Sequence, residues 1–339
     1  MFFEEDNSFD HIKNQLELGY RIPGTEAREN CAQYFIKEFK KLDPNFLSFL
    51  HNFTVESIEC QNVLFKLNEK EDNIVILGAH YDTRKIAEKD SNPEKRDQPI
   101  PGANDGASGC AVLLELARIL YHRREELNCE IWFLFFDAED QGSGGMSGWD
   151  WCEGSQQFVE DIEIYYDNNS ESFDCMILLD MVGGENLQFI WELYSNSLLM
   201  EDLFKIGRDL GYKYSFPEDP IRASITDDHK AFSEIGIPTA DLIIKFWSQP
   251  DEWPYHHTHG DNLTHISKES LKITGTTVEQ FLYNNYHPSY SLKYQGNYPW
   301  DKNQPSNPLF GIILLIVITG AITGICFIRS RLLHLTKGS

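Results

Sequence analysis

The sequence predicts a three-layer α/β domain with a mostly parallel central sheet, followed by one C-terminal transmembrane helix. Strand-like apolar runs alternate with helix-like stretches along most of the chain, the order that builds a parallel sheet covered by helices on both sides. Residues 129–136 and 175–179 are nearly unbroken apolar runs, typical of strands buried on both faces. Residues 309–328 contain no charged side chain, which predicts a membrane helix.

The predicted elements begin with a helix at residues 28–42, where apolar side chains recur at helical spacing after the turn at residues 22–25. Two short strands are expected next, at residues 62–67 and 74–77. A polar loop at 84–101 and a second helix at 107–121 follow them. The later strands are expected at 129–136, 175–179 and 239–244, and the later helices near 198–211 and 268–284. We find no internal repeat.

The apolar run at residues 309–328 is long enough to span a bilayer as a single helix. Arg329, Arg331 and Lys337 follow it, which argues against the alternative of a buried core helix and favours a cytoplasmic carboxyl end. We therefore divide the chain into a main domain at residues 1–285 and three C-terminal parts. These parts are a linker at 286–308, the membrane helix at 309–328 and a basic tail at 329–339.

This orientation predicts a single-pass membrane protein whose main domain is extracellular or lies in a lumen. Residues 1–10 are acidic and lack the basic and apolar regions of a signal peptide. A tail-anchored protein with its main domain in the cytosol is therefore the alternative topology.

The composition allows one large buried core, because 41% of the 339 residues are hydrophobic. The 53 acidic and 29 basic residues give a formal charge of -24, which argues against a nucleic-acid partner, since phosphate binding needs a basic face. The seven cysteines include no CxxC pair, so we predict no cysteine-rich zinc knuckle. A metal ion must then be held by His, Asp and Glu side chains, which suit zinc and leave manganese or cobalt open.

Polar side chains follow several of the predicted strands, where open α/β sheets bind their ligands. His80 follows the strand at 74–77 and can ligate a metal ion, while Asp82 can hold the other imidazole nitrogen in the required tautomer. Asp105 lies among small residues at the start of the helix at 107–121, where the backbone can approach an ion closely. The plain alternative for Asp105 is a helix N-cap.

An acidic cluster follows the buried strand at 129–136. Adjacent acids repel unless a cation or a proton separates them, so we expect Asp140 to ligate the metal ion and Glu139 to carry a proton. Asp180 follows the strand at 175–179 in the same way, and residues 255–261 offer three histidines and an acid in one loop. All these side chains are expected at one edge of the sheet, so the sequence predicts a metal site there.

The succession AHYDT, PGANDGASG, FFDAEDQG, LLDMVG and HHTHGD resembles the zinc aminopeptidase superfamily, which also contains the glutaminyl-peptide cyclotransferases. The resemblance runs from about Gly19 to Leu282 and implies that residues 1–285 form a zinc-dependent catalytic domain. The positions that line the metal site in such enzymes correspond here to His80, Asp105, Asp140, Asp180 and His257. Glu139 corresponds to the general base. Typical aminopeptidases have two glutamates at the acidic pair, and Asp140 is one methylene shorter than the second of them.

The resemblance implies one of two reactions at peptide or protein N-termini. In the aminopeptidases two zinc ions bind a hydroxide that attacks the first peptide carbonyl, and the glutamate accepts its proton. In the cyclotransferases one zinc ion, held at the positions of Asp105, Asp140 and His257, polarises the side-chain carbonyl of an N-terminal glutamine. The α-amine then attacks, with Glu139 carrying the proton to the departing ammonia and Asp180 positioning the amine.

The surrounding residues favour the cyclotransferase reaction, with aminopeptidase hydrolysis as the alternative. The Asp-Ala-Glu-Asp frame around Glu139, the nearby Trp149 and Trp151, and the Asp-Asp-His stretch at 227–229 resemble cyclotransferases. These enzymes have a histidine where this chain has Asp241. A membrane-tethered binding ectodomain on an inactive peptidase fold is a third hypothesis, which the five retained ligand positions argue against.

Overall fold

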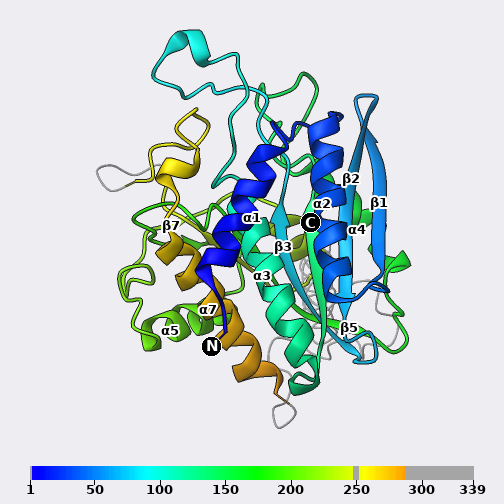
Figure 1. Cartoon of the computed structure of the whole chain (residues 1–339). Coiled ribbons are helices and arrows are strands. Elements are labelled where there is room, and N and C mark those ends of the chain that lie inside the picture. Colours follow the sequence, from blue (N-terminus) through cyan, green and yellow to red (C-terminus); the bar gives the residue numbers. More distant parts are fainter. Residues whose placement is uncertain (1, 247–251, 288–339) are drawn as a thin grey trace, which may run out of the picture. The chain divides into compact units, whose positions relative to one another are not determined.

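A six-stranded mixed sheet forms the centre of the computed structural model, which describes residues 2–246 and 252–287 (Figure 1). The strands lie in the order β1-β2-β4-β3-β5-β8. Their bounds are β1 (Ser48–Val55), β2 (Ile58–Leu67), β3 (Asn73–His80), β4 (Glu130–Phe136), β5 (Ser172–Asp180) and β8 (Thr239–Ile243). β4, β3, β5 and β8 are parallel, whereas β1 and β2 are antiparallel to their neighbours. The prediction of a mostly parallel sheet is confirmed.

Helices cover both faces of this sheet. Their bounds are α1 (Glu5–Glu17), α2 (Glu26–Leu42), α3 (Ala107–Arg123), α4 (Glu153–Glu160), α5 (Ser197–Asp209), α6 (His229–Glu234) and α7 (Lys268–Tyr286). Helices α2, α3 and α7 pack in the main hydrophobic core, and α1 lies over α3 and α7 (Figure 1). Helices α4 and α6 contact the strands from the other side. Two short strands, β6 (Trp191–Glu192) and β7 (Arg222–Ala223), form a separate small parallel sheet.

The buried strands and α3 fix the position of the loops that follow them. All residues of β4 are buried, as are all but the first residues of β3 and β5. Helix α3 approaches β5 so closely that a β-carbon on Gly109 would lie 2.0 Å from the backbone oxygen of Leu179. His80 pairs with Phe136 across β3 and β4, and Asp180 pairs with Ile243 across β5 and β8. The carboxyl ends of the four parallel strands therefore meet at one edge of the sheet.

The chain divides into two units, residues 1–298 and 299–339. Within residues 2–246 and 252–287, no helix has both the length and the apolar character needed to cross a membrane. The predicted membrane helix at 309–328, the tail at 329–339 and nearly all of the predicted linker lie outside the described residues.

Candidate active site

His80, Asp105 and Asp180 form one cluster at the carboxyl edge of the sheet. His80 ends β3, Asp105 lies in the loop before α3, and Asp180 ends β5. Nε2 of His80 lies 3.1 Å from Oδ1 of Asp105 and 3.2 Å from Oδ1 of Asp180. These three side chains are buried and present one nitrogen and two carboxylate oxygens to a common point, as the ligands of a metal ion do.

His257 and Asp140 form a second cluster that shares Asp105 with the first. Nε2 of His257 lies 3.1 Å from Oδ1 of Asp140 and 3.9 Å from Oδ2 of Asp105. His256 lies at the edge of this group, with Nε2 3.9 Å from the same Asp105 oxygen. The two oxygens of Asp105 thus face different histidines, His80 on one side and His257 on the other.

The donor set fits a metal ion. Oδ2 of Asp140 is buried and accepts no hydrogen bond from any residue that the structure describes, which is costly for a carboxylate oxygen unless a cation faces it. Histidine nitrogen and carboxylate oxygen are ligands that zinc takes in hydrolytic sites. The residues that would hold zinc are the five predicted from the sequence: His80, Asp105, Asp140, Asp180 and His257.

A closed ring of polar contacts supports His257 and Asp140. Oε1 of Glu88 lies 2.6 Å from Nδ1 of His257, and Arg84 donates from Nε to Oε2 of Glu88 at 2.8 Å. Arg84 also donates from Nη1 to the backbone oxygen of Asp140 at 3.0 Å, with Oδ1 at 3.4 Å. Burial would lower the pKa of His257, but Asp140 and Glu88 raise it to about 9. Because Glu88 contacts Nδ1 of His257, it orients the imidazole so that Nε2 faces the metal position.

Two further buried carboxylates hold the loops in place. Asp82 lies 3.3 Å from Nδ1 of His80, as predicted, and it accepts hydrogen bonds from the backbone nitrogens of Glu139 at 3.0 Å and Asp140 at 3.2 Å. Asp261 accepts hydrogen bonds from the backbone nitrogen of Asp105 and from that of the residue before it. These contacts fix the directions of the proposed ligands.

Glu139 lies beside the metal cluster without belonging to it. The Cys152 thiol donates to Oε1 of Glu139 at 3.3 Å, and Glu139, Cys152 and Asp227 each place a polar atom within 4.8 Å of the other two. Burial, together with neighbouring carboxylates such as Asp140, raises the pKa of Glu139 well above its ordinary value, despite the opposing effect of His80. A buried carboxyl group beside the metal position suits a proton carrier.

A cavity of about 280 Å³ opens onto these residues. Asp105, Glu139, Asp140, Asp180 and His257 line it on the polar side. Its other walls include the aromatic and aliphatic side chains of Trp151, Ile225, Ile243 and Phe246. A partly apolar pocket with convergent polar groups is typical of a substrate-binding site.

Several residues in or next to the active site have an unusual backbone conformation. Ala138, Cys152, Met181 and His257 all have left-handed φ values, between 48° and 61°, and each lies in or next to the site. Non-glycine residues in this region carry strain that accumulates at functional sites. Gly106 lies so close to His80 that a β-carbon on it would be 2.4 Å from Nε2, so only glycine fits there.

The remaining residues that the sequence analysis named lie in different surroundings. Trp149 packs in a small apolar cluster with Phe53 and Val55, whereas Trp151 lines the cavity, with its ring 6.0 Å from that of His257. His259 pairs with Asp90, with Nδ1 3.1 Å from Oδ2. We did not predict the contributions of Arg84, Glu88 and Asp227. Their only sequence signals are a position in the polar loop after His80 and a position in the Asp-Asp-His stretch.

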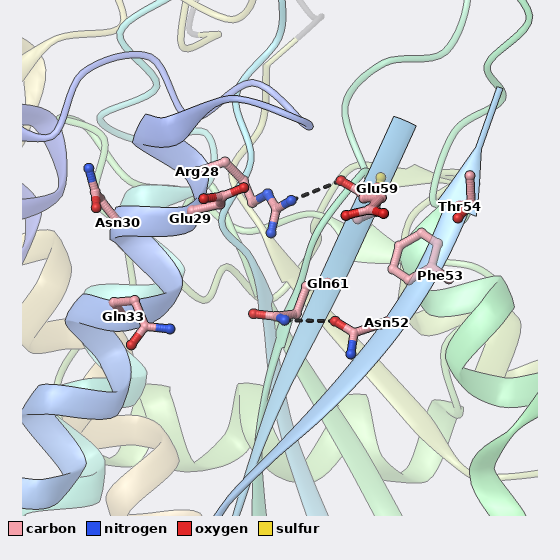
Figure 2. A pocket seen from close by; sticks show the side chains of 10 residues that line it. Arg28, Glu29, Asn30, Gln33, Asn52, Phe53, Thr54, Glu59 and Gln61 are labelled. Carbon is pink, nitrogen blue, oxygen red and sulfur yellow. Dashed lines mark hydrogen bonds between the residues drawn. The ribbon is translucent and has the colours of Figure 1, made fainter. Parts of the chain in front are cut away.

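A larger hollow, of about 630 Å³, lies between α2 and the β1–β2 hairpin (Figure 2). Arg28 donates there to the backbone oxygen of Glu59 at 2.8 Å, and Gln61 donates to Asn52 at 2.7 Å. None of the predicted metal ligands lines this hollow. We therefore place the active site at the smaller cavity, because the reactive side chains are there.

Comparison with known proteins identifies the family of this chain. Residues 62–282 match Peptidase family M28, and the chain belongs to this family. The chain is 30% identical over 221 residues to aminopeptidase YwaD of Bacillus subtilis (strain 168), an alignment that covers 64% of this chain and 42% of that protein. It spans less than half the length of the first three curated relatives it matches.

Two solved structures cover the fold almost completely. A Zn-dependent exopeptidase from Parabacteroides distasonis is 32% identical, with a TM-score of 0.75, and the match covers 84% of this chain and 99% of the other. A glutaminyl cyclase from Bacteroides thetaiotaomicron is 31% identical, also with a TM-score of 0.75, over 84% of this chain and 98% of the other. The family and these relatives confirm zinc as the predicted cofactor.

Proposed function

We propose that this chain is a zinc-dependent enzyme that cyclises N-terminal glutamine of peptides to pyroglutamate and releases ammonia. The observation that carries this proposal is the position of Asp227, which lines the cavity within 4.8 Å of Glu139. Cyclisation must take a proton from the attacking amine and deliver one to the leaving nitrogen. Two adjacent carboxyl groups on the cavity wall provide a route between these two positions.

In the proposed reaction the glutamine side chain enters the cavity between Trp151 and Phe246. Bound zinc supplies Lewis acidity at the side-chain carbonyl. The α-amine nitrogen forms a bond to the carbonyl carbon, and the bond from that carbon to the amide nitrogen breaks. Glu139 accepts a proton from the amine and passes it to the leaving nitrogen, which departs as ammonia.

Asp180 has a positioning role in this reaction. Its carboxylate lines the cavity beside His80, where it can accept a hydrogen bond from the substrate amine. Holding the amine close to the carbonyl carbon replaces the entropy cost of an encounter with a fixed geometry. Ile225 and Ile243 add apolar side chains to the wall of the same cavity.

The second candidate is hydrolysis of the N-terminal peptide bond by an aminopeptidase with two zinc ions. The observation that favours it is Asp105, whose Oδ1 faces His80 at 3.1 Å while Oδ2 faces His257 at 3.9 Å. A carboxylate placed between two nitrogen ligands can bridge a pair of ions. The relatives support both reactions, because their names include an aminopeptidase and a glutaminyl cyclase.

Product analysis separates the two. We expect the full chain, loaded with zinc, to release ammonia from a peptide that begins with glutamine and to leave the peptide chain intact. A matched peptide beginning with leucine serves as the control and should remain unchanged. Release of a free amino acid from either peptide without ammonia would overturn cyclisation and support hydrolysis. Counting zinc ions in the His80 and His257 clusters adds a second criterion, since two ions favour hydrolysis and one favours cyclisation.

A further inference from the structure

A second group of buried ionisable side chains lies next to the active-site cavity and shares only Asp227 with the reaction proposed above. Asp227 lies in the loop before α6, and His229 is the first residue of that helix. Asp241 lies on β8, and Glu192 ends β6. All four side chains are buried, and His229, Asp241 and Glu192 have no solvent exposure. Asp227, His229 and Asp241 each place a ligand atom within 4.8 Å of the other two.

His229 is oriented as a metal-bound histidine is. Its Nε2 lies 2.9 Å from Oε2 of Glu192, so this nitrogen carries the proton and donates it. Burial would raise the pKa of Glu192, but the hydrogen bond from His229 and backbone hydrogen bonds, such as that from Ile225, lower it to about 2. A carboxylate that holds one imidazole nitrogen leaves the other free to ligate, which is the usual arrangement around protein-bound zinc.

The free nitrogen of His229 faces carboxylate oxygens that have no donor. Nδ1 of His229 lies 3.8 Å from Oδ2 of Asp241, too far for a hydrogen bond. Neither oxygen of Asp241, nor Oδ2 of Asp227, accepts a hydrogen bond from the described residues. A lone pair that faces other lone pairs in a buried space is unfavourable unless a cation or a proton lies between them.

The charges around Asp241 make this arrangement costly. Its strongest electrostatic neighbours besides Asp227 are the carboxylates of Glu192, Asp180 and Asp228. Within residues 2–246 and 252–287, no lysine or arginine forms an ion pair with Asp227, Asp228 or Asp241. Burying several acids without a compensating cation costs several kcal/mol or forces them to bind protons.

From this geometry we propose that Asp227, His229 and Asp241 bind an additional divalent transition-metal ion, distinct from the ions of the active site. Two ligand atoms that each lie 2.0–2.1 Å from a tetrahedral zinc ion are about 3.3 Å apart. Nδ1 of His229 and Oδ2 of Asp241 are 3.8 Å apart, so a small movement of these side chains would bring them to that distance. One imidazole nitrogen and two carboxylates suit zinc, with manganese or cobalt as weaker matches.

The ion would have a structural role. It would join β8 to the loop before α6, and through Glu192 it would extend to β6. Asp227 lies on the cavity wall, so the ion would also fix the direction of this carboxylate beside Glu139. The proposal stands on the cluster alone and does not depend on which reaction the active site performs.

The test is the number of zinc ions per chain in the full protein after equilibration with zinc and removal of excess metal, measured by elemental analysis. Asp241→Asn keeps the size of the side chain but removes its charge, and we expect it to bind one ion fewer than the wild type. Asp174→Asn is the matched control, because Asp174 is a buried residue of the same sheet, on β5, and it should retain the full number. Asp105→Asn should lose active-site zinc and retain the additional ion.

An unchanged ion count in Asp241→Asn would overturn the proposal and indicate that these acids are neutralised by protons. If this variant does not fold, anomalous diffraction at the zinc edge from wild-type crystals replaces it. A peak beside Nδ1 of His229 supports the site, and a peak only beside Asp105 and His257 refutes it. The second result would leave the proposed function of the active site intact.

Discussion

Replacing Glu88 by glutamine tests the polar ring that supports the metal cluster. Glu88 faces two donors at once, with Oε1 2.6 Å from Nδ1 of His257 and Oε2 2.8 Å from Nε of Arg84. Glutamine has one acceptor oxygen, so its amide nitrogen must face one of these two donors. The variant therefore loses either the contact that fixes the His257 ring or the contact that holds Arg84 against Asp140.

The size of the effect follows from these contacts. Losing one hydrogen bond to a charged group costs about 1.5–3 kcal/mol. Loss of an outer partner of a metal-bound histidine lowers metal affinity about 10–100-fold, which corresponds to about 1.4–2.7 kcal/mol. Both estimates agree, so we expect Glu88→Gln to bind zinc about 10–100-fold more weakly than the wild type.

Competition with a chromogenic chelator measures this affinity directly. Glu94→Gln is the matched control, because Glu94 is an exposed glutamate of the same loop and should leave zinc binding unchanged. If Glu88→Gln binds zinc within about twofold of the control, a difference of about 0.4 kcal/mol, then Glu88 does not position His257 and the reasoning fails.

Two further predictions concern Glu139 and Glu130. Glu139→Gln should lower turnover about 10²–10⁴-fold while the zinc content stays unchanged, since Glu139 is proposed as a proton carrier; loss of the metal would refute that role. Burial raises the pKa of Glu130 on β4 to about 7. Because the unfolded chain releases this proton first, stability should fall as pH rises from about 4.5 to above 7, by at most about 3 kcal/mol before solvent screening. Urea unfolding should show this decline, and Glu130→Gln should weaken it; an equal decline in the variant would exclude Glu130 as its source.

Most of the central sheet could be predicted from the sequence because its strands are buried on both faces. β4 and β5 appear as apolar runs, and their bounds differ from the prediction by only a few residues. Helix α1 was not predicted, because its few apolar side chains include Ile12 among mostly polar neighbours. Its place is decided by packing over α3 and α7, which local pattern does not encode.

Strands β1 and β6 and helix α4 were also missed. β1 is an edge strand in which exposed and buried residues alternate from Leu50 to Val55, and its buried residues include the polar His51. Helix α4 follows Cys152, whose left-handed conformation no sequence rule anticipates. β1 and α4 depend on contacts with β2, and β6 depends on contacts with β7 and β8, so their signals are tertiary.

The sequence by itself determined which residues could form the metal site. His80 and Asp180 end their strands, Asp140 follows β4 and Asp105 precedes α3, and parallel strands bring their carboxyl ends to one edge. That reasoning is local and topological, and the structure does bring these side chains together. It also gave Glu139 as a neighbour of the site, although not its contact with Cys152.

Only the tertiary structure decided how these residues are supported. Glu88 and His257 are 169 positions apart, and Glu192 and His229 are 37 apart, so no spacing rule pairs them. Folding brings each acid to its histidine because buried imidazoles and carboxylates must satisfy one another where water is absent. The sequence therefore supplied the ligands, and the packing of distant loops determined their orientation and the second buried cluster beside them.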